Sequence, residues 1–242
     1  MAYHNLLVGH DGGVVIVKMA RAGARNALNQ ALITELREVL AKISADINAR
    51  AMILTGEGDV FCAGDAEFRA PLLALWNELA SFTKPLVMAA NGHGIGGGFE
   101  LALMGDAVVI ADNAQFWLPE VQWGGIPGGW GTQLLPRIVG PLRARWIILN
   151  GHKIGAREMM FMGLATHVAA RAEVLDTART IAAELATRPP TAVAMAKQAI
   201  REAMVLPLTE GITAEEQLLQ QAVTAPERKA MLDRFAQGHR PR

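Results

Sequence analysis

The stretch Asn91-Gly-His-Gly-Ile-Gly-Gly-Gly-Phe-Glu100 decides the local fold, because it joins a buried strand to a helix. The apolar run 85–90 before it predicts that strand. Three glycines followed closely by Glu100 predict a helix start with unhindered backbone N–H groups and a carboxylate. Such N–H groups can hold a developing oxyanion, because the helix dipole there favours negative charge. We therefore expect an anion-stabilising site at this junction.

A dinucleotide-binding loop is the alternative interpretation of these glycines, since Gly92-His-Gly94-Ile-Gly-Gly97 fits G-x-G-x-x-G after a strand. Against it, the motif lies some ninety residues into the chain, and its helix ends near Gly105, which is short for a crossover. The expected acidic partner is poorly placed, with Asp112 early and Glu120 after a proline. The pattern alone is a weak signal, and close backbone packing would also require glycines. The oxyanion interpretation is favoured.

A second carboxylate, Glu120, ends the stretch Ala114-Gln-Phe-Trp-Leu-Pro-Glu120, twenty residues after Glu100. Either glutamate by itself would be interpreted as a surface or capping residue, because an acidic side chain in a first helical turn is favourable without a catalytic role. The pair gains significance from the motifs that surround both residues.

The composition fits one large domain or a domain with a small appendage. Of the 242 residues, 51% are hydrophobic, which is enough for a sizeable core. Zero net charge argues against nucleic-acid and anionic-membrane partners. Cys62 is the single cysteine, which excludes an internal disulfide and a multi-cysteine zinc cluster. Neither a signal peptide before Tyr3 nor a membrane-spanning apolar run is evident, so we expect a cytoplasmic protein.

Hydrophobic periodicity predicts strands and helices in the front half of the chain. Asp11-Gly12-Gly13 predicts a hairpin turn, and Asn29 is the expected N-cap of a helix with leucines at helical spacing. Pro71 confines the start of a second helix to its first turn. The predicted strands are 6–9, 14–19, 51–54, 85–90 and 107–111, and the predicted helices are 28–43 and 70–82.

Beyond Pro127 the chain is predicted to be mostly helical, with breaks at Pro189-Pro190 and Leu206-Pro207. The predicted helices are 132–138, 142–149, 156–162, 172–186, 192–204 and about 215–235. We divide the chain into a core, residues 1–190, and a C-terminal helical oligomerisation region, residues 191–242.

A set of short motifs along nearly the whole chain resembles the crotonase superfamily, specifically enoyl-CoA hydratases and isomerases. No single motif is specific, but together they are. They are Arg25-Asn-Ala-Leu28, Leu54-Thr-Gly56, Phe61-Cys-Ala-Gly64, Asn91 to Glu100, Ala114-Gln-Phe116, Pro119-Glu120, Gly125-Ile-Pro-Gly128, Gly131-Thr-Gln133 and Leu149-Asn-Gly151.

The resemblance implies an α/β fold, a right-handed crotonase-like spiral of ββα units with a C-terminal helical trimerisation region. It implies a homotrimer or a dimer of trimers that binds acyl-CoA thioesters and stabilises an enolate at the thioester oxygen. Coenzyme A would be part of the substrate, so no separate cofactor is expected. No metal is expected either, and the six histidines show no ligand spacing.

The resemblance also assigns the residues of the site. Gly97 matches a glycine whose N–H donates to the thioester oxygen, and the second donor, after Phe61-Cys-Ala-Gly64, falls at Asp65. Glu100 and Glu120 match the two hydratase carboxylates. Of these, Glu120 is expected to transfer the proton, with Glu100 as its partner in holding and activating water.

Further residues are expected to bind substrate. By resemblance, Ala27, Ala63 and Asp65 fall where backbone groups line the CoA channel, and Pro119 belongs to the same motif as Glu120. Three other residues have simpler interpretations: Cys62 as a small buried side chain, His93 as structural, and Arg25 as solvated, although it could meet a CoA phosphate.

The chain departs from the family pattern in three places. An acidic residue stands at Asp65, one position earlier than usual, and the segment from there to Lys84 is short by about a helix. Trp117 and Trp130 occupy positions that are commonly small, so each either reshapes the acyl pocket or packs between layers or subunits.

Hydration of a 2-enoyl-CoA is the favoured function. The alternatives are an enoyl-CoA isomerase, which can work with one carboxylate at Glu120, another crotonase-type reaction such as hydrolysis or decarboxylation, and a catalytically weak CoA-thioester binder. An RNA-binding hydratase is disfavoured, because the net charge is zero and no basic stripe is evident.

Overall fold

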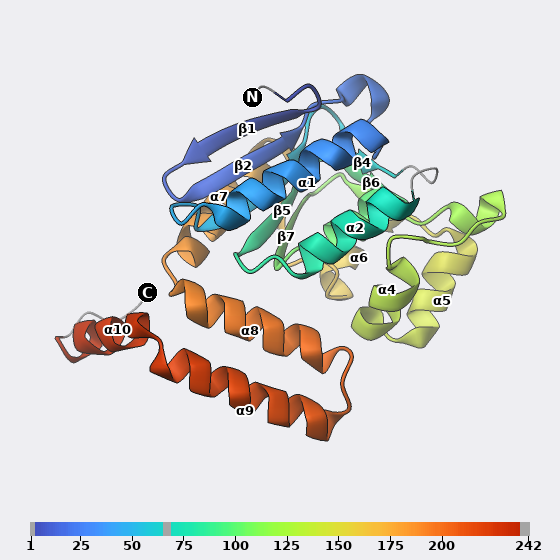
Figure 1. Cartoon of the computed structure of the whole chain (residues 1–242). Helices are drawn as coiled ribbons and strands as arrows, with labels where there is room; N and C mark the ends of the chain where they lie inside the picture. Colours follow the sequence, from blue (N-terminus) through green and yellow to red (C-terminus); the bar gives the residue numbers. More distant parts are fainter. Residues whose placement is uncertain (1–2, 65–68, 238–242) are drawn as a thin grey trace. The chain divides into compact units, whose positions relative to one another are not determined.

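Strands of two sheets alternate along the chain in the computed structural model, which describes residues 3–64 and 69–237 (Figure 1). Each repeat supplies a strand to a larger sheet, a strand to a smaller sheet, and then a helix. Two successive repeats are β3 (Ala51–Gly56), β4 (Val60–Ala63) and α2 (Arg69–Ala80), and then β5 (Leu86–Ala90), β6 (His93–Ile95) and α3 (Gly97–Ala102). The predicted α/β spiral of ββα units is confirmed.

Within the described residues the larger sheet has six strands in the order β1-β2-β3-β5-β7-β10. The hairpin of β1 and β2 is antiparallel, as predicted, and the other pairings are parallel. All residues of β3, β5 and β7 are buried, as expected for parallel strands covered on both faces. The remaining strands are β1 (Leu6–Asp11), β2 (Val14–Met19), β7 (Ala107–Ala111) and β10 (His167–Ala169).

The smaller sheet carries the segments of the candidate site, and it was not predicted. Its described strands run in the order β4-β6-β8-β9, with β8 at Gln115–Trp117 and β9 at Ile154–Gly155. Strands of two to four residues are too short to show a periodicity of two. The sequence pattern therefore did not reveal them.

Helices cover both faces of the larger sheet. The predicted helix at 28–43 is α1 (Gln30–Ala45), and the Asn29 side chain caps it by accepting a hydrogen bond from Leu32 N–H at 2.9 Å. In Figure 1, α1 lies in front of the strands and α7 (Val174–Ala186) behind them, where α7 contacts the central strands.

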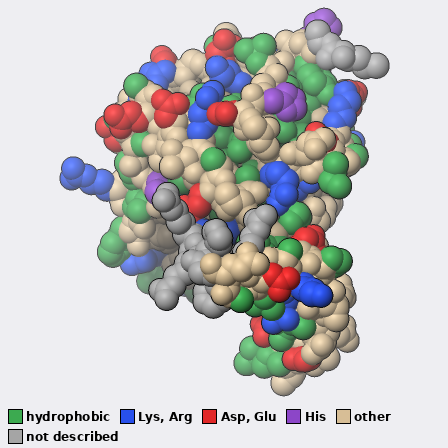
Figure 2. Space-filling view, turned by 90° about the vertical axis from the view of Figure 1, so that its left-hand side faces the viewer, with side chains coloured by type: hydrophobic (Ala, Val, Ile, Leu, Met, Phe, Trp, Pro, Cys, Tyr) green, Lys and Arg blue, Asp and Glu red, His purple; other side chains and the backbone are tan. Residues whose placement is uncertain are grey.

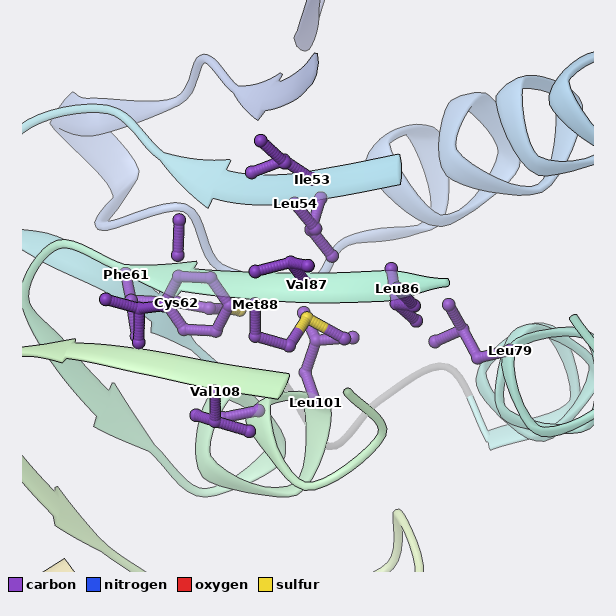
Figure 3. Packing of buried hydrophobic residues seen from close by; sticks show 14 of the residues in the cluster. Ile53, Leu54, Phe61, Cys62, Leu79, Leu86, Val87, Met88, Leu101 and Val108 are labelled. Carbon is purple, nitrogen blue, oxygen red and sulfur yellow. The ribbon is translucent and has the colours of Figure 1, made fainter. Parts of the chain in front are cut away.

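The core lies between these layers. Figure 3 shows side chains of β3, β4, β5 and β7 meeting those of α2 and α3. Phe61 and Cys62 are buried together, which agrees with Cys62 as a small core residue. Burial without a charged partner also raises the pKa of the Cys62 thiol, so it stays protonated and unreactive.

Shorter helices follow the core strands, close to the predicted ranges. They are α4 (Gly131–Val139), α5 (Pro141–Asn150) and α6 (Ala156–Phe161), with the 3₁₀ segments η1 (Ala22–Ala24), η2 (Glu120–Trp123) and η3 (Arg171–Glu173).

The chain divides into two units, residues 1–186 and 187–242. The second contains α8 (Pro190–Ala203), α9 (Leu208–Thr224) and α10 (Pro226–Ala236). The prediction of one last helix at about 215–235 is wrong, because Ala225 is extended before Pro226, which disfavours helical backbone at the residue before it. The oligomerisation role of this region stays a prediction.

Charged side chains of both signs are interspersed over the face of the molecule in Figure 2. Among the described residues, no helix is long and apolar enough to cross a membrane.

Candidate active site

The glycine run places the start of α3 against the end of β4. A Cβ on Gly98 would lie 1.8 Å from the Cys62 carbonyl oxygen, and one on Gly64 would lie 2.2 Å from the Gly97 nitrogen. Backbone therefore meets backbone here, and side chains at these two glycines would force the elements apart. Close packing, offered above as an alternative reason for the glycines, thus operates together with the helix start.

Gly97 is the first residue of α3, as predicted. Gly96 precedes it with φ +52° and donates its N–H to the Trp117 carbonyl at 2.9 Å. This backbone conformation suits glycine, and it turns the chain from β6 into the helix. The N–H of a first helical residue has no partner within its own helix, so the Gly97 N–H can serve an external oxygen.

The second expected donor, Asp65, lies outside the described residues. The described residues before it contact the segment that contains Ala27. Ala63 donates its N–H to the Arg25 carbonyl at 3.0 Å and accepts from Leu28 N–H at 3.3 Å. These bonds bring the segment containing Ala27 alongside β4, so Ala27, Ala63 and Gly97 gather at one end of the smaller sheet.

Glu100 is buried, with 2% of its surface exposed, and two backbone N–H groups hold its carboxylate. Gly131 donates to Oε1 at 2.7 Å, and Gly129 donates to Oε1 and Oε2, both at 2.9 Å. Trp130, between the two donors, has φ 72°, a left-handed conformation uncommon for a bulky residue. The N–H groups on either side of this left-handed residue both point to the same carboxylate.

A tryptophan that the sequence interpretation did not single out supports this arrangement. Trp76 of α2 is fully buried, and its Nε1–H donates to the Gly129 carbonyl at 2.5 Å. No sequence pattern predicted this contact or the N–H donors of Gly129 and Gly131. The residues are distant in sequence, and two of them act through backbone atoms.

Glu120 begins η2, directly after Pro119, and its carboxylate reaches back to the start of α3. A Cβ on Gly96 would lie 2.7 Å from Glu120 Oε1, so the carboxylate lies beside the residue before Gly97. Its other oxygen, Oε2, is buried and has no hydrogen-bond partner among the described residues. A buried oxygen in this state has a lone pair ready for a proton or a water.

Burial shifts both carboxyl groups toward their neutral forms. The pKa of Glu100 is raised to about 7: desolvation is the main cause and the charge of Glu120 adds to it, while the Gly131 and Gly129 N–H bonds act in the opposite direction. The pKa of Glu120 is also raised, mainly by desolvation. Two such groups that interact titrate as a pair, so near neutral pH they can share a proton.

The two tryptophans at positions that are commonly small both pack against other parts of the protein. The ring of Trp117 packs edge-on to His93 at 6.1 Å and under Lys153, whose Nζ lies 4.8 Å from the ring centroid. Trp130 is partly buried against the core. His93 Nδ1 accepts from Gln115 N–H at 3.0 Å, which agrees with its structural interpretation. Within the described part of the chain, no group of three or more potential ligands could hold a metal ion.

Comparisons with known proteins identify relatives over nearly the whole chain. The family model "Enoyl-CoA hydratase/isomerase" matches residues 9–242. A 2,3-dehydroadipyl-CoA hydratase of Escherichia coli is 34% identical, over 98% of this chain and 97% of its own. A carnitinyl-CoA dehydratase of Proteus mirabilis is 35% identical, over 83% and 81%. The crystal structure of an enoyl-CoA hydratase from Bacillus anthracis is 32% identical, covers 99% and 98%, and superposes with a TM-score of 0.93.

Proposed function

The chain belongs to the enoyl-CoA hydratase/isomerase family, and from that premise we propose that it adds water across the 2,3 double bond of a 2-enoyl-CoA thioester. The observation that carries the proposal is the pair of glutamates beside Gly97, of which Glu100 is buried and Glu120 is partly buried. Hydration needs one water to be held and deprotonated, and Cα to be protonated. Two carboxylates that share a proton can perform both tasks.

The two carboxylates suit different roles. Glu100 is held by Gly129 and Gly131, so it is the fixed partner that orients water. Glu120 keeps Oε2 free of protein donors, so it is the group that takes a proton from water and passes one to Cα. The raised pKa of each group makes proton exchange near neutral pH feasible.

The thioester oxygen gains negative charge as water adds to Cβ. The Gly97 N–H and the N–H of Asp65 would stabilise that oxygen, and losing one such donor typically costs about 3–4 kcal/mol of barrier. The CoA portion would run past Ala27 and Ala63, with Pro119 beside the acyl group. This mechanism requires no cofactor and no metal, because charge stabilisation and proton transfer both come from the chain.

The first experiment incubates the purified protein with crotonyl-CoA and with a longer 2-enoyl-CoA. Hydration removes the absorbance of the conjugated enoyl thioester and adds the mass of one water. Dependence on both Glu100 and Glu120 would support hydration. An isomerised 3-enoyl product of unchanged mass, which retains dependence on Glu120 but not on Glu100, would indicate an isomerase. Binding of the CoA ester without turnover would indicate that the protein is a catalytically weak CoA-thioester binder.

We further propose that the protein works in the cytoplasm as a homotrimer or a dimer of trimers, without nucleic-acid partners. Large apolar side chains exposed within residues 1–186 support an assembly, since subunit interfaces commonly bury such side chains. The most exposed are Ile47 at 88%, Trp123 at 84%, Phe161 at 78% and Leu142 at 74%. Light scattering at several concentrations tests this, and a persistent mass near 25.9 kDa would refute it.

A further inference from the structure

Trp76 is joined to the catalytic carboxylate through one residue. Its indole N–H donates to the Gly129 carbonyl, and the N–H of that same glycine is shared between both oxygens of Glu100. A helix in the wall of the site, α2, is thereby connected to a carboxylate on α3 by two consecutive hydrogen bonds.

Gly129 is enclosed by these two partners. A Cβ at this position would lie 2.6 Å from Glu100 Oε2 and 3.0 Å from two carbons of the Trp76 indole. Gly129 therefore has little freedom to move while both contacts hold. The orientation of the Glu100 carboxylate then depends on where the indole holds this glycine.

We propose that Trp76 is a positioning residue for hydration, whose indole N–H fixes Gly129 and thereby the orientation of Glu100. The proposal rests on the proposed function, because it assigns Trp76 a role in that reaction. Trp76 itself need not touch substrate, and its ring also packs in the core.

The hydrogen bond makes a prediction that packing does not. N–H donors favour the charged form of a carboxylate, so weakening the Gly129 bond should raise the pKa of Glu100 above its native value of about 7. Among the described residues, Glu120 is the other titratable group that acts on Glu100, and it lies on a different segment from Trp76. A change at Trp76 should therefore reach Glu100 through Gly129.

The test replaces Trp76 by β-(3-benzothienyl)alanine through site-specific incorporation, which keeps the ring shape and substitutes sulfur for the N–H. The pKa of Glu100 is read by NMR of ¹³C-carboxyl-labelled glutamate without substrate, with Glu100→Gln to assign the signal. The pH profile of kcat for crotonyl-CoA hydration is measured alongside. Trp76→Phe serves as a second variant that can be made by ordinary mutagenesis.

The matched control is Leu79→Val, on the same helix. Leu79 is buried and its side chain lies near Leu86 of β5 (Figure 3). Like Trp76→Phe, this change removes buried atoms from α2, but it leaves the bond to Gly129 intact. It should lower stability without moving the pKa of Glu100 or the pH profile.

The expected result in the sulfur variant is an upward shift of the Glu100 titration and of the acidic limb of kcat by roughly one pH unit, the size expected when a hydrogen bond to a carboxylate is weakened. KM should change little. An unshifted Glu100 titration in the folded sulfur variant would overturn the proposal. If the native protein hydrates no enoyl-CoA, the proposed function fails separately, and the NMR titration still decides whether Trp76 controls Glu100.

Discussion

The two glutamates of the site lie in contrasting surroundings. Glu100 projects from a regular helix, and the N–H groups of Gly129, in the loop before α4, and of Gly131, the first residue of α4, bind both of its oxygens. Glu120 projects from a short 3₁₀ segment, and one of its oxygens has no partner among the described residues. Glu100 is buried and Glu120 partly buried, and desolvation raises the pKa of both, so desolvation by itself does not distinguish their roles. The hydrogen bonds do, because a held carboxylate orients and a free one exchanges protons.

The largest effect is expected where the free carboxylate is removed. Glu120→Gln keeps the shape of the side chain but cannot act as a base, so we expect kcat for hydration to fall by about 10³-fold or more. Stopped-flow or long-time assays measure the residual rate, and calorimetry with a saturated acyl-CoA measures binding, which should stay near native. A variant that hydrates at the native rate would reverse the roles assigned to the two glutamates.

Removing the oxyanion donor beside both glutamates should have the next largest effect. Gly97→Pro eliminates one N–H and should lower kcat by about 10²–10³-fold. Gly97→Ala is the matched control, because it keeps the N–H and its Cβ would approach Gly64 Cα at a tight but adjustable 3.3 Å. Circular dichroism must show both variants folded. Equal loss of activity in the two would mean that steric disturbance, rather than the missing donor, is responsible.

Replacing the held carboxylate should change how stability depends on pH. Glu100 has a pKa of about 7 when folded and 4.5 when unfolded. Between these values the native state binds a proton that the unfolded state lacks, so the free energy of unfolding falls as pH rises through this window. Glu100→Gln removes that fall, so its stability relative to the native protein should improve by about 3 kcal/mol from pH 4.5 to pH 7.

Denaturant titrations at several pH values measure this difference. The Gln amide faces the N–H donors, which lowers the free energy of unfolding of the variant by the same amount at every pH. This constant penalty does not change how the difference between the two proteins depends on pH. Curves for the native protein and Glu100→Gln that run parallel across the window would contradict a raised pKa of Glu100.

The smallest effect is expected at Trp117, whose ring lies against His93 and Lys153 rather than either glutamate. Trp117→Gly should lower stability by about 1–2 kcal/mol and leave the preference for acyl-chain length unchanged. Lys153→Met, which removes the charge above the ring, should cost about 0.5–1 kcal/mol. A broadened preference in Trp117→Gly would show that the ring borders the acyl pocket.

The sequence predicted the larger sheet better than the smaller one, for a physical reason. Strands such as β5 are continuous apolar runs bounded by turn residues, and this pattern can be recognised in the sequence alone. The smaller sheet consists of short segments whose pairing depends on backbone contact at glycines such as Gly98. That contact appears when distant parts of the chain meet, so local patterns cannot reveal it.

The candidate site divides in the same way. Glu100, Glu120 and Gly97 could be singled out, because they stand in motifs with a recognisable order along the chain. The donors to Glu100 are peptide N–H groups, and any residue except proline supplies one. Trp76 is an apolar residue at helical spacing, which predicts a core position and conceals the use of its N–H.

The burial of Trp76 also means that its fluorescence can report on the site. Of the five tryptophans, Trp76 is fully enclosed, whereas Trp123 and Trp146 are 84% and 59% exposed. Iodide in solution would quench the emission of exposed indoles and leave that of an enclosed one. The fluorescence that remains would come from rings shielded from the quencher. The part of it that is lost in Trp76→Phe comes from Trp76, which is connected to Glu100 through Gly129 alone. Its change with pH would follow the protonation of the catalytic carboxylate in the unmodified protein, without a substrate or a label.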